Sequence, residues 1–139
     1  LTTILAYMAI GALGFDVFQS STAELNGLSY MMGTTGGYLV GYVLAVGLMG
    51  VLARRGWDRS VLWMAGAMLL GNLVLYVPGL AWLGVLIGEG MFRPEAYASV
   101  WEQTFAWGLT PFLIGDAMKL ALAALLLPAA WALVGRARR

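Results

Sequence analysis

The sequence predicts an all-α integral membrane protein, a bundle of helices long enough to cross a lipid bilayer. Of its 139 residues, 61% are hydrophobic and only 11% are charged. Soluble domains are about 45–50% apolar and about 25% charged, so this chain has too few polar side chains to cover a water-facing globule. The length leaves room for about four or five spans of about 20 residues each. We therefore predict a single transmembrane domain over residues 1–139.

The available side-chain chemistry narrows the possible functions. The chain has no cysteine and no histidine, so it lacks the commonest general base and the commonest transition-metal ligands. Without a nucleophile and its base, we expect no enzyme, no metal site and no cofactor. The net charge of +1 gives no electrostatic footprint for nucleic acid. The sequence also contains no phosphate-binding P-loop, so ATP could be used only by partner subunits.

The first two stretches are an apolar segment and a polar loop. Residues 1–15 are apolar but short for a complete span, and we expect them to be the end of a helix whose beginning precedes Leu1. Residues 16–33 are rich in polar side chains and contain Asn26-Gly27, a pair typical of turns. We predict a loop here, and its length favours a loop that contacts ligand over a minimal connection.

Two complete spans follow. Residues 34–53 form the first and begin with Gly36-Gly37, where the absence of side chains lets another helix or a ligand approach the backbone closely. Residues 61–87 form the second. At about 1.5 Å per residue this stretch is longer than a bilayer of about 30 Å, so it must tilt, kink or break. Pro78-Gly79 marks the position where we expect this irregularity.

A short helix and the last span complete the chain. Residues 88–110 form an outer loop in which Tyr97, Trp101 and Phe105 recur at helical spacing. One aromatic face of this kind is typical of a short helix at the membrane interface. Residues 111–134 form the final span. The predicted spans are therefore about 1–15, 34–53, 61–87 and 111–134.

Charge predicts the orientation in the membrane. Six of the seven arginines fall in two places on one side of the predicted spans: 54, 55 and 59, then 136, 138 and 139. Most of the acidic residues fall on the other side: Asp16, Glu24, Glu89, Glu95 and Glu102. Because basic residues concentrate in cytoplasmic loops, we expect the C-terminus in the cytoplasm and the acidic loops outside.

The candidate site lies in the outer half of the spans. Asp116 and Lys119 are three residues apart, so on a helix they share a face. A charge in hydrocarbon costs about 2.5–3.5 kcal/mol even on the lenient insertion scale, so we expect this pair to hold a polar ligand. Tyr38 and Tyr76 lie at a similar depth. Asn72 shares a face with Tyr76, and its amide could equally bind a ligand or another helix.

Three stretches resemble the BioY family, the biotin-binding S component of energy-coupling-factor (ECF) transporters. Residues 33–39 (GTTGGYL) resemble the family's G-P-T-G-G-Y-L signature, and residues 111–119 (PFLIGDAMK) resemble its P-F-L-P-G-D-x-x-K motif. Between them, residues 71–83 (GNLVLYVPGLAWL) are similar to the family's fifth helix. The resemblance implies an S-component-like bundle, with about four of an expected six transmembrane helices present and the first two lacking.

The same resemblance implies a function and a site. The protein would capture biotin from the outer side of a bacterial or archaeal cell membrane, and a transmembrane coupling (T) subunit with ATPase subunits would drive its import. The family's Asp and Lys of the last helix match Asp116 and Lys119. The remaining implied or neighbouring site residues are Asn26, Thr35, Gly36, Gly37, Tyr38, Asn72 and Tyr76. A proton-coupled secondary transporter of a small polar solute is the alternative, since an intramembrane Asp also suits a proton relay.

Overall fold

The chain is folded into helices. Its structure is a computed structural model that describes residues 1–19, 22 and 25–137. All regular elements in these residues are helical, which confirms the predicted all-α class. In chain order they are α1 (Thr2–Ala12), α2 (Gly27–Met31), α3 (Gly36–Arg54), the 3-10 turn η1 (Trp57–Arg59), α4 (Val61–Leu86), the π turn η2 (Ile87–Met91), α5 (Val100–Gly108), the 3-10 turn η3 (Thr110–Phe112) and α6 (Leu113–Ala137).

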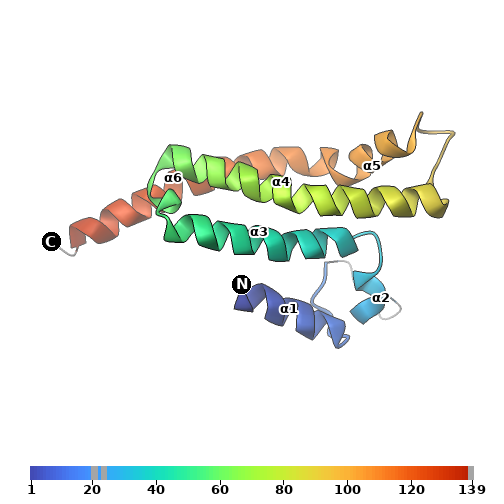
Figure 1. The fold of residues 1–139 in the computed structure, drawn as a ribbon, viewed down its shortest axis with the longest axis horizontal. Helices are drawn as coiled ribbons and strands as arrows, with labels where there is room; N and C mark the ends of the chain where they lie inside the picture. Colours follow the sequence, from blue (N-terminus) through green and yellow to red (C-terminus); the bar gives the residue numbers. More distant parts are fainter. Residues whose placement is uncertain (20–21, 23–24, 138–139) are drawn as a thin grey trace.

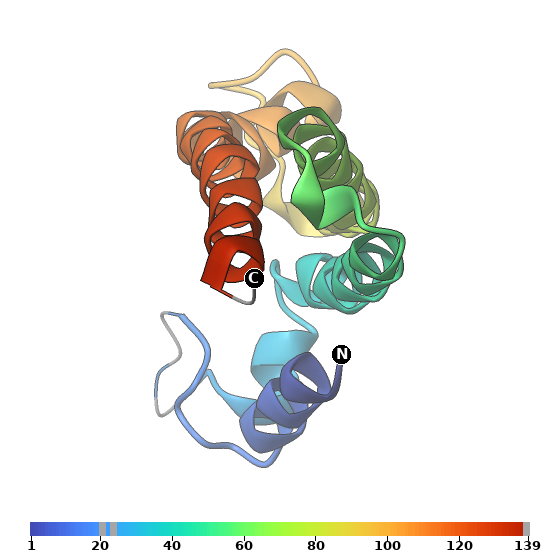
Figure 2. The same cartoon turned by 90° about the vertical axis from the view of Figure 1, so that its left-hand side faces the viewer.

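The long helices lie side by side. In the described residues, three helical stretches are long and apolar enough to cross a membrane: Gly36–Arg54, Val61–Met91 and Val100–Gly135. α1 is apolar but shorter, as the sequence predicted. α4 packs against both α3 and α6, and the three long helices alternate in direction (Figure 1). Viewed along the bundle, α1 and α2 lie against α3 on the side away from α4 (Figure 2).

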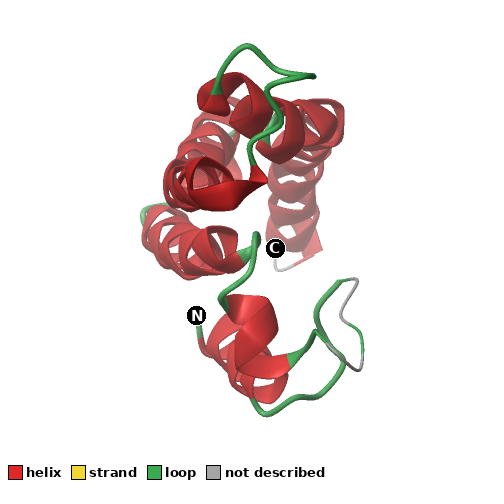
Figure 3. Ribbon diagram, turned by 90° about the vertical axis from the view of Figure 1, so that its right-hand side faces the viewer, coloured by secondary structure: helices red, strands yellow, loops and turns green. Residues whose placement is uncertain are grey.

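Charged residues are separated along the bundle. The turn between α3 and α4 lies at the same end as the last turn of α6 (Figure 1). We call this the arginine end, after three residues in or beside that turn: Arg54, Arg55 and Arg59. Three glutamates lie at the opposite end, in η2, α5 and the loop between them: Glu89, Glu95 and Glu102. Figure 3 views the bundle from this end. Of the residues in the predicted charge pattern, Glu24, Arg138 and Arg139 lie outside the described part of the chain.

Glycines bring α3 and α4 into backbone contact. A Cβ added at Gly37 would lie 2.4 Å from the carbonyl oxygen of Pro78, and one at Gly41 would lie 2.5 Å from that of Leu75. Real Cβ atoms do not come so close, so neither position has room for any side chain. Small residues at such positions allow the close helix packing typical of membrane proteins.

α4 does not break at Pro78, where the sequence analysis placed the expected irregularity. The helix continues through this residue to Leu86, and the irregular segment is the π turn η2 that follows. A proline inside a helix removes one hydrogen bond. The group that loses its partner is the carbonyl of Val74, four residues earlier, and membrane helices tolerate one such loss. α3 packs closely on this part of α4, with Gly37 beside the Pro78 carbonyl.

Part of the predicted loop 16–33 is helical. α2 begins at Gly27, whose φ of 58° is the left-handed conformation expected of the Asn26-Gly27 turn. The short helix is held by aromatic contacts, since the ring of Phe18 stacks on that of Tyr30 with centroids 4.8 Å apart. Packing between these distant side chains is invisible to a reading of local polarity, which explains why a loop was predicted.

α5 is the short helix expected within residues 88–110. Ser99 precedes it, and its hydroxyl oxygen accepts a hydrogen bond from the backbone N–H of Glu102 at 3.1 Å. This cap starts the helix after Tyr97, so the prediction that Tyr97 lies on the helix was wrong. Trp101 and Phe105 do contact each other, with ring centroids 6.2 Å apart.

At the arginine end, α6 is held by the turn between α3 and α4. The indole N–H of Trp131 donates to one carboxylate oxygen of Asp58 at 2.7 Å, and the guanidinium of Arg59 lies 4.9 Å from the centre of the Trp131 ring. The second oxygen of Asp58 is buried without a partner in the described residues. The carboxylate therefore depends on Trp131 for its hydrogen bonding.

Replacing Trp131 by phenylalanine should lower the free energy of unfolding by about 0.5–1.5 kcal/mol, because the hydrogen bond from its exposed indole to the half-buried Asp58 carboxylate is lost. The measurement is thermal unfolding in detergent. Trp63→Phe is the control, since Trp63 packs on Trp57 with centroids 4.7 Å apart and its indole N–H bonds to no described residue. An equal loss in both variants would show that the Asp58 hydrogen bond contributes nothing.

Candidate ligand-binding site

A cavity of about 620 Å³ lies toward the end of the bundle opposite the arginine end. All six α-helices contribute to its lining, for example through Tyr7, Tyr30, Tyr38, Tyr76, Trp107 and Asp116. In the described residues α6 packs on α4 and η1 but not on α3, and the cavity lies between α3 and α6. Its volume falls in the range of about 300–1,000 Å³ typical of small-molecule sites.

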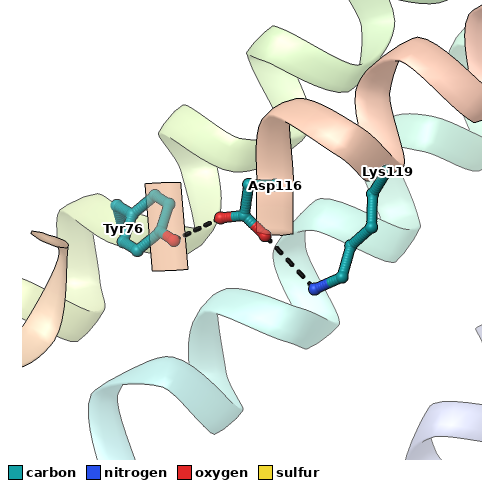
Figure 4. Close-up of polar contacts among 3 residues, drawn as sticks. All are labelled: Tyr76, Asp116 and Lys119. Atoms are coloured by element: carbon teal, nitrogen blue, oxygen red, sulfur yellow. Dashed lines mark hydrogen bonds and ion pairs between the residues drawn. The ribbon is translucent and has the colours of Figure 1, made fainter. Parts of the chain in front are cut away.

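Three side chains from two helices form the polar centre of the cavity. The hydroxyl of Tyr76 on α4 donates to Oδ2 of Asp116 on α6, and the ammonium of Lys119 lies 3.2 Å from Oδ1 (Figure 4). The Asp116 side chain is 16% exposed, whereas that of Lys119 is 72% exposed. Each carboxylate oxygen thus has one partner and can accept one more hydrogen bond. The ammonium retains two further donors.

The sequence of α6 accounts for this geometry. Pro111 lies in the 3-10 turn η3 that leads into α6, where its missing N–H costs nothing. Asp116 follows in the first turn of α6, where the positive end of the helix dipole favours a carboxylate. Lys119 comes one turn later on the same face. The pair is therefore positioned by α6 alone, and α4 adds the third member.

Tyr38 forms a wall beside this polar centre. Its hydroxyl donates to the carbonyl oxygen of Gly108 at 2.9 Å, and its ring meets that of Tyr76 edge-on with centroids 6.3 Å apart. The ring occupies space that only glycines leave free, because a Cβ at Gly79 would lie 2.5 Å from it and one at Gly108 would lie 2.3 Å from its hydroxyl. Tyr38 is thus fixed at both ends.

Trp107 forms a second wall and is supported by the loop before α5. Its indole N–H donates to the Tyr97 hydroxyl at 3.0 Å, and the guanidinium of Arg93 lies 5.3 Å from its ring centre. The fully buried Gln103 holds this loop: its amide oxygen accepts from the Arg93 backbone N–H at 2.8 Å, and its amide nitrogen donates to the Met91 carbonyl at 2.9 Å.

The structure brings together six of the nine predicted site residues as cavity lining: Thr35, Tyr38, Asn72, Tyr76, Asp116 and Lys119. The other three do not line it. Asn26 precedes α2. Gly36 and Gly37 face protein, since a Cβ at Gly36 would lie 2.2 Å from the Met31 carbonyl oxygen and one at Gly37 would meet Trp82. Their lack of a side chain serves helix packing in this structure.

Sequence reasoning missed most of the aromatic lining: Tyr7, Phe18, Tyr30, Tyr42, Trp107 and Phe112. These side chains come from five elements and intervening loops, and no spacing pattern links them. Their only local signal is the density of aromatic residues beside polar stretches, which is equally typical of a membrane interface. In the described residues, no group of three His, Cys, Asp or Glu side chains could hold a metal ion.

Comparison with known proteins identifies the family. The sequence model of the BioY family matches residues 1–136, nearly the whole chain. This chain belongs to the BioY family. The three stretches that resemble it are thus parts of one continuous match. BioY members are membrane proteins named as biotin transporters, so the chain is a membrane protein of a transporter family and not an enzyme.

Curated BioY relatives come from bacteria and archaea. The chain is 35% identical over 124 residues to a probable biotin transporter BioY of Methanothermobacter thermautotrophicus, covering 88% of this chain and 74% of that protein. It is 29% identical over 123 residues to the biotin transporter BioY of Thermotoga maritima and 30% identical over 124 residues to a probable one of Pyrococcus horikoshii. The chain spans about 63% of the length of these last two proteins. No solved structure matches it significantly.

Proposed function

We propose that this protein binds biotin in the cavity between α3 and α6, as the substrate-capturing membrane subunit of a biotin uptake transporter. The observation that carries the proposal is the Asp116–Lys119 pair, ordered by Tyr76 inside a cavity with aromatic walls. Biotin combines a polar cyclic urea with an apolar ring and tail. A site of this kind has apolar walls and a few well-placed polar groups.

The pair matches the urea of biotin in both chemistry and spacing. The Lys119 Nζ atom lies 3.2 Å from Asp116 Oδ1, so one small ligand group can form hydrogen bonds with both side chains. The edge of a cyclic urea carries a carbonyl oxygen beside an N–H group. The Asp116 carboxylate would accept from that N–H, and the Lys119 ammonium would donate to the oxygen. Both bonds are charge-assisted, which makes them roughly twice as strong as neutral ones.

The charge distribution supports an orientation in the membrane, and the sequence motifs support a source of energy for import. The arginine end would face the cytoplasm of a bacterial or archaeal cell, with the C-terminus, and the cavity would open toward the outside. Since the chain contains no P-loop, import would use ATP hydrolysed by the ATPase subunits of an ECF module, connected through its transmembrane T subunit. The lipid bilayer of the inner membrane would surround the long helices.

Two measurements test this function. Titration calorimetry of the purified protein in detergent with biotin should give saturable binding at one site per chain. Uptake in cells should require ATPase partners and survive a proton uncoupler. Uptake that an uncoupler abolishes and that needs no ATPase would instead identify a proton-coupled transporter. A folded protein with no affinity for biotin would rule out the biotin assignment.

Replacing Lys119 by methionine should weaken biotin binding by about 10- to 150-fold, as expected for one charge-assisted hydrogen bond worth about 1.5–3 kcal/mol. The affinity for biotin amide, whose tail carries no charge, should fall by the same factor because the urea is unchanged. Calorimetry of both ligands provides the measurement. Arg55→Met, at the arginine end, is the matched control and should leave both affinities unchanged. A loss confined to biotin would place the tail carboxylate at Lys119 instead.

A further inference from the structure

Asn72 lies at the floor of the ligand cavity. It is near the middle of α4, one helical turn from Tyr76 toward the arginine end. A second cavity, of about 550 Å³, lies beyond it toward that end, and three residues line both cavities: Tyr42, Asn72 and Leu75. Asn72 therefore lines the ligand cavity where it adjoins the second one, about 6 Å along the helix from the residue that binds Asp116.

The Asn72 amide has no hydrogen-bond partner in the part of the chain that the structure describes. Three polar groups of the lining nearer to Asp116 bond to protein: the hydroxyls of Tyr38 and Tyr76, and the indole N–H of Trp107. The hydroxyls of Tyr7, Thr34, Thr35 and Tyr42 share the unpartnered state of Asn72 among the described residues, and Asn72 is the only one of these five on α4, the helix that also carries Tyr76. Asn72 is half-buried and its amide is not among the buried unpartnered groups, so its donors and acceptor are available to a molecule in the cavity. A residue retained in this state at a cavity floor is suited to bind what enters the cavity.

We infer that Asn72 binds the second N–H of the ligand's urea, on the edge opposite the one held by Asp116 and Lys119. This inference rests on the proposed biotin function. A cyclic urea has two N–H groups flanking one carbonyl oxygen, and Asp116 with Lys119 accounts for one N–H and the oxygen. The Asn72 side-chain oxygen accepts the remaining N–H, and its amide nitrogen can donate to the same urea oxygen. Asn72 thereby selects ligands that carry two free urea N–H groups.

The first test measures affinity and stability together in the purified protein. Asn72→Leu, which keeps the size of the side chain, should weaken biotin binding by about 3- to 10-fold, as for one neutral hydrogen bond. Its thermal unfolding temperature should stay the same or rise, because the substitution breaks no hydrogen bond to a described residue. A structural hydrogen-bonding role predicts the opposite: a lower unfolding temperature. Biotin affinity within twofold of the wild type, or a clear loss of stability, would overturn the inference.

The second test uses the two isomers of biotin that carry a methyl group on one urea nitrogen. The wild-type protein should bind both more weakly than biotin. Asn72→Ala, which makes room for a methyl group, should remove the penalty for one isomer and leave it for the other, which still meets Asp116. If both penalties persist in Asn72→Ala, Asn72 does not contact the urea. A wild-type protein that binds no biotin would refute the proposed function itself, which keeps the two failures distinguishable.

Discussion

Replacing Asp116 by asparagine is expected to weaken biotin binding by about 10- to 150-fold, the effect of losing a charge-assisted hydrogen bond worth about 1.5–3 kcal/mol. The change removes the charge that organises the site. Asp116 accepts from the Tyr76 hydroxyl and pairs with the Lys119 ammonium at 3.2 Å, so both partners lose the group that positions them. Calorimetry with biotin measures the loss, and thermal unfolding of the same sample shows whether the bundle remains folded.

The matched control makes the same chemical change at the other end of the bundle. Asp58→Asn alters a carboxylate that accepts from Trp131 and does not line the ligand cavity. An asparagine oxygen can still accept that hydrogen bond, so biotin affinity should be unchanged. Equal effects of the two substitutions would mean that Asp116 acts through general electrostatics or folding. An Asp116→Asn variant with wild-type affinity would remove this residue from the site.

The second large effect is expected at Gly37. Gly37→Ala should destabilise the protein by about 1–3 kcal/mol, as overpacking of a close contact does. The added methyl group would lie 2.4 Å from both the Pro78 carbonyl oxygen and the Trp82 Cβ, so α3 and α4 must separate. The adjacent residue, Tyr38, would move with the helix and disturb the cavity wall. Thermal unfolding measures the loss of stability, and calorimetry measures the accompanying loss of affinity.

Gly47→Ala is the control on the same helix. A Cβ at Gly47 meets nothing within 4 Å, so the substitution should leave the unfolding temperature unchanged or raise it slightly, since alanine favours helix over glycine. Comparison of the Gly37→Ala and Gly47→Ala variants also decides between two interpretations of Gly37. If Gly37→Ala keeps its stability but loses biotin, the Gly37 backbone contacts ligand, as the family signature suggested. Loss of stability with or without ligand identifies a packing glycine.

Local sequence properties predicted the parts of this protein that depend on local chemistry. Apolar length places α3, α4 and α6, because a membrane helix must satisfy its own backbone hydrogen bonds. The Asp116–Lys119 pair was predictable because both residues lie on one helix face. A charged side chain in a membrane span is also costly, so it is seldom found without a partner or a ligand. Tyr76 was predicted from its depth, and the structure adds that its hydroxyl binds Asp116 directly.

What could not be predicted depends on contacts between distant segments. The ring of Phe18 stacks on Tyr30 of α2, and α4 continues through Pro78 where Gly37 of α3 packs against it. The wall formed by Trp107 depends on Gln103, a buried polar side chain that bonds two backbone groups of another loop. The residues in each of these contacts are not related by a regular spacing in the sequence, so the contacts could not be predicted from sequence periodicity.

The distribution of the site over the helices has a consequence for how the protein is made. Tyr38 and Tyr76 belong to α3 and α4, whereas the charged pair of the site belongs to α6, which is synthesised after both. Until α6 has entered the membrane, the described cavity lining that comes from the earlier helices contains no charged side chain. Pairing of Lys119 with Asp116 inside one helix also lowers the cost of bringing two charges across the interface. Ligand binding would thus report that α6 has been inserted and has packed against α4.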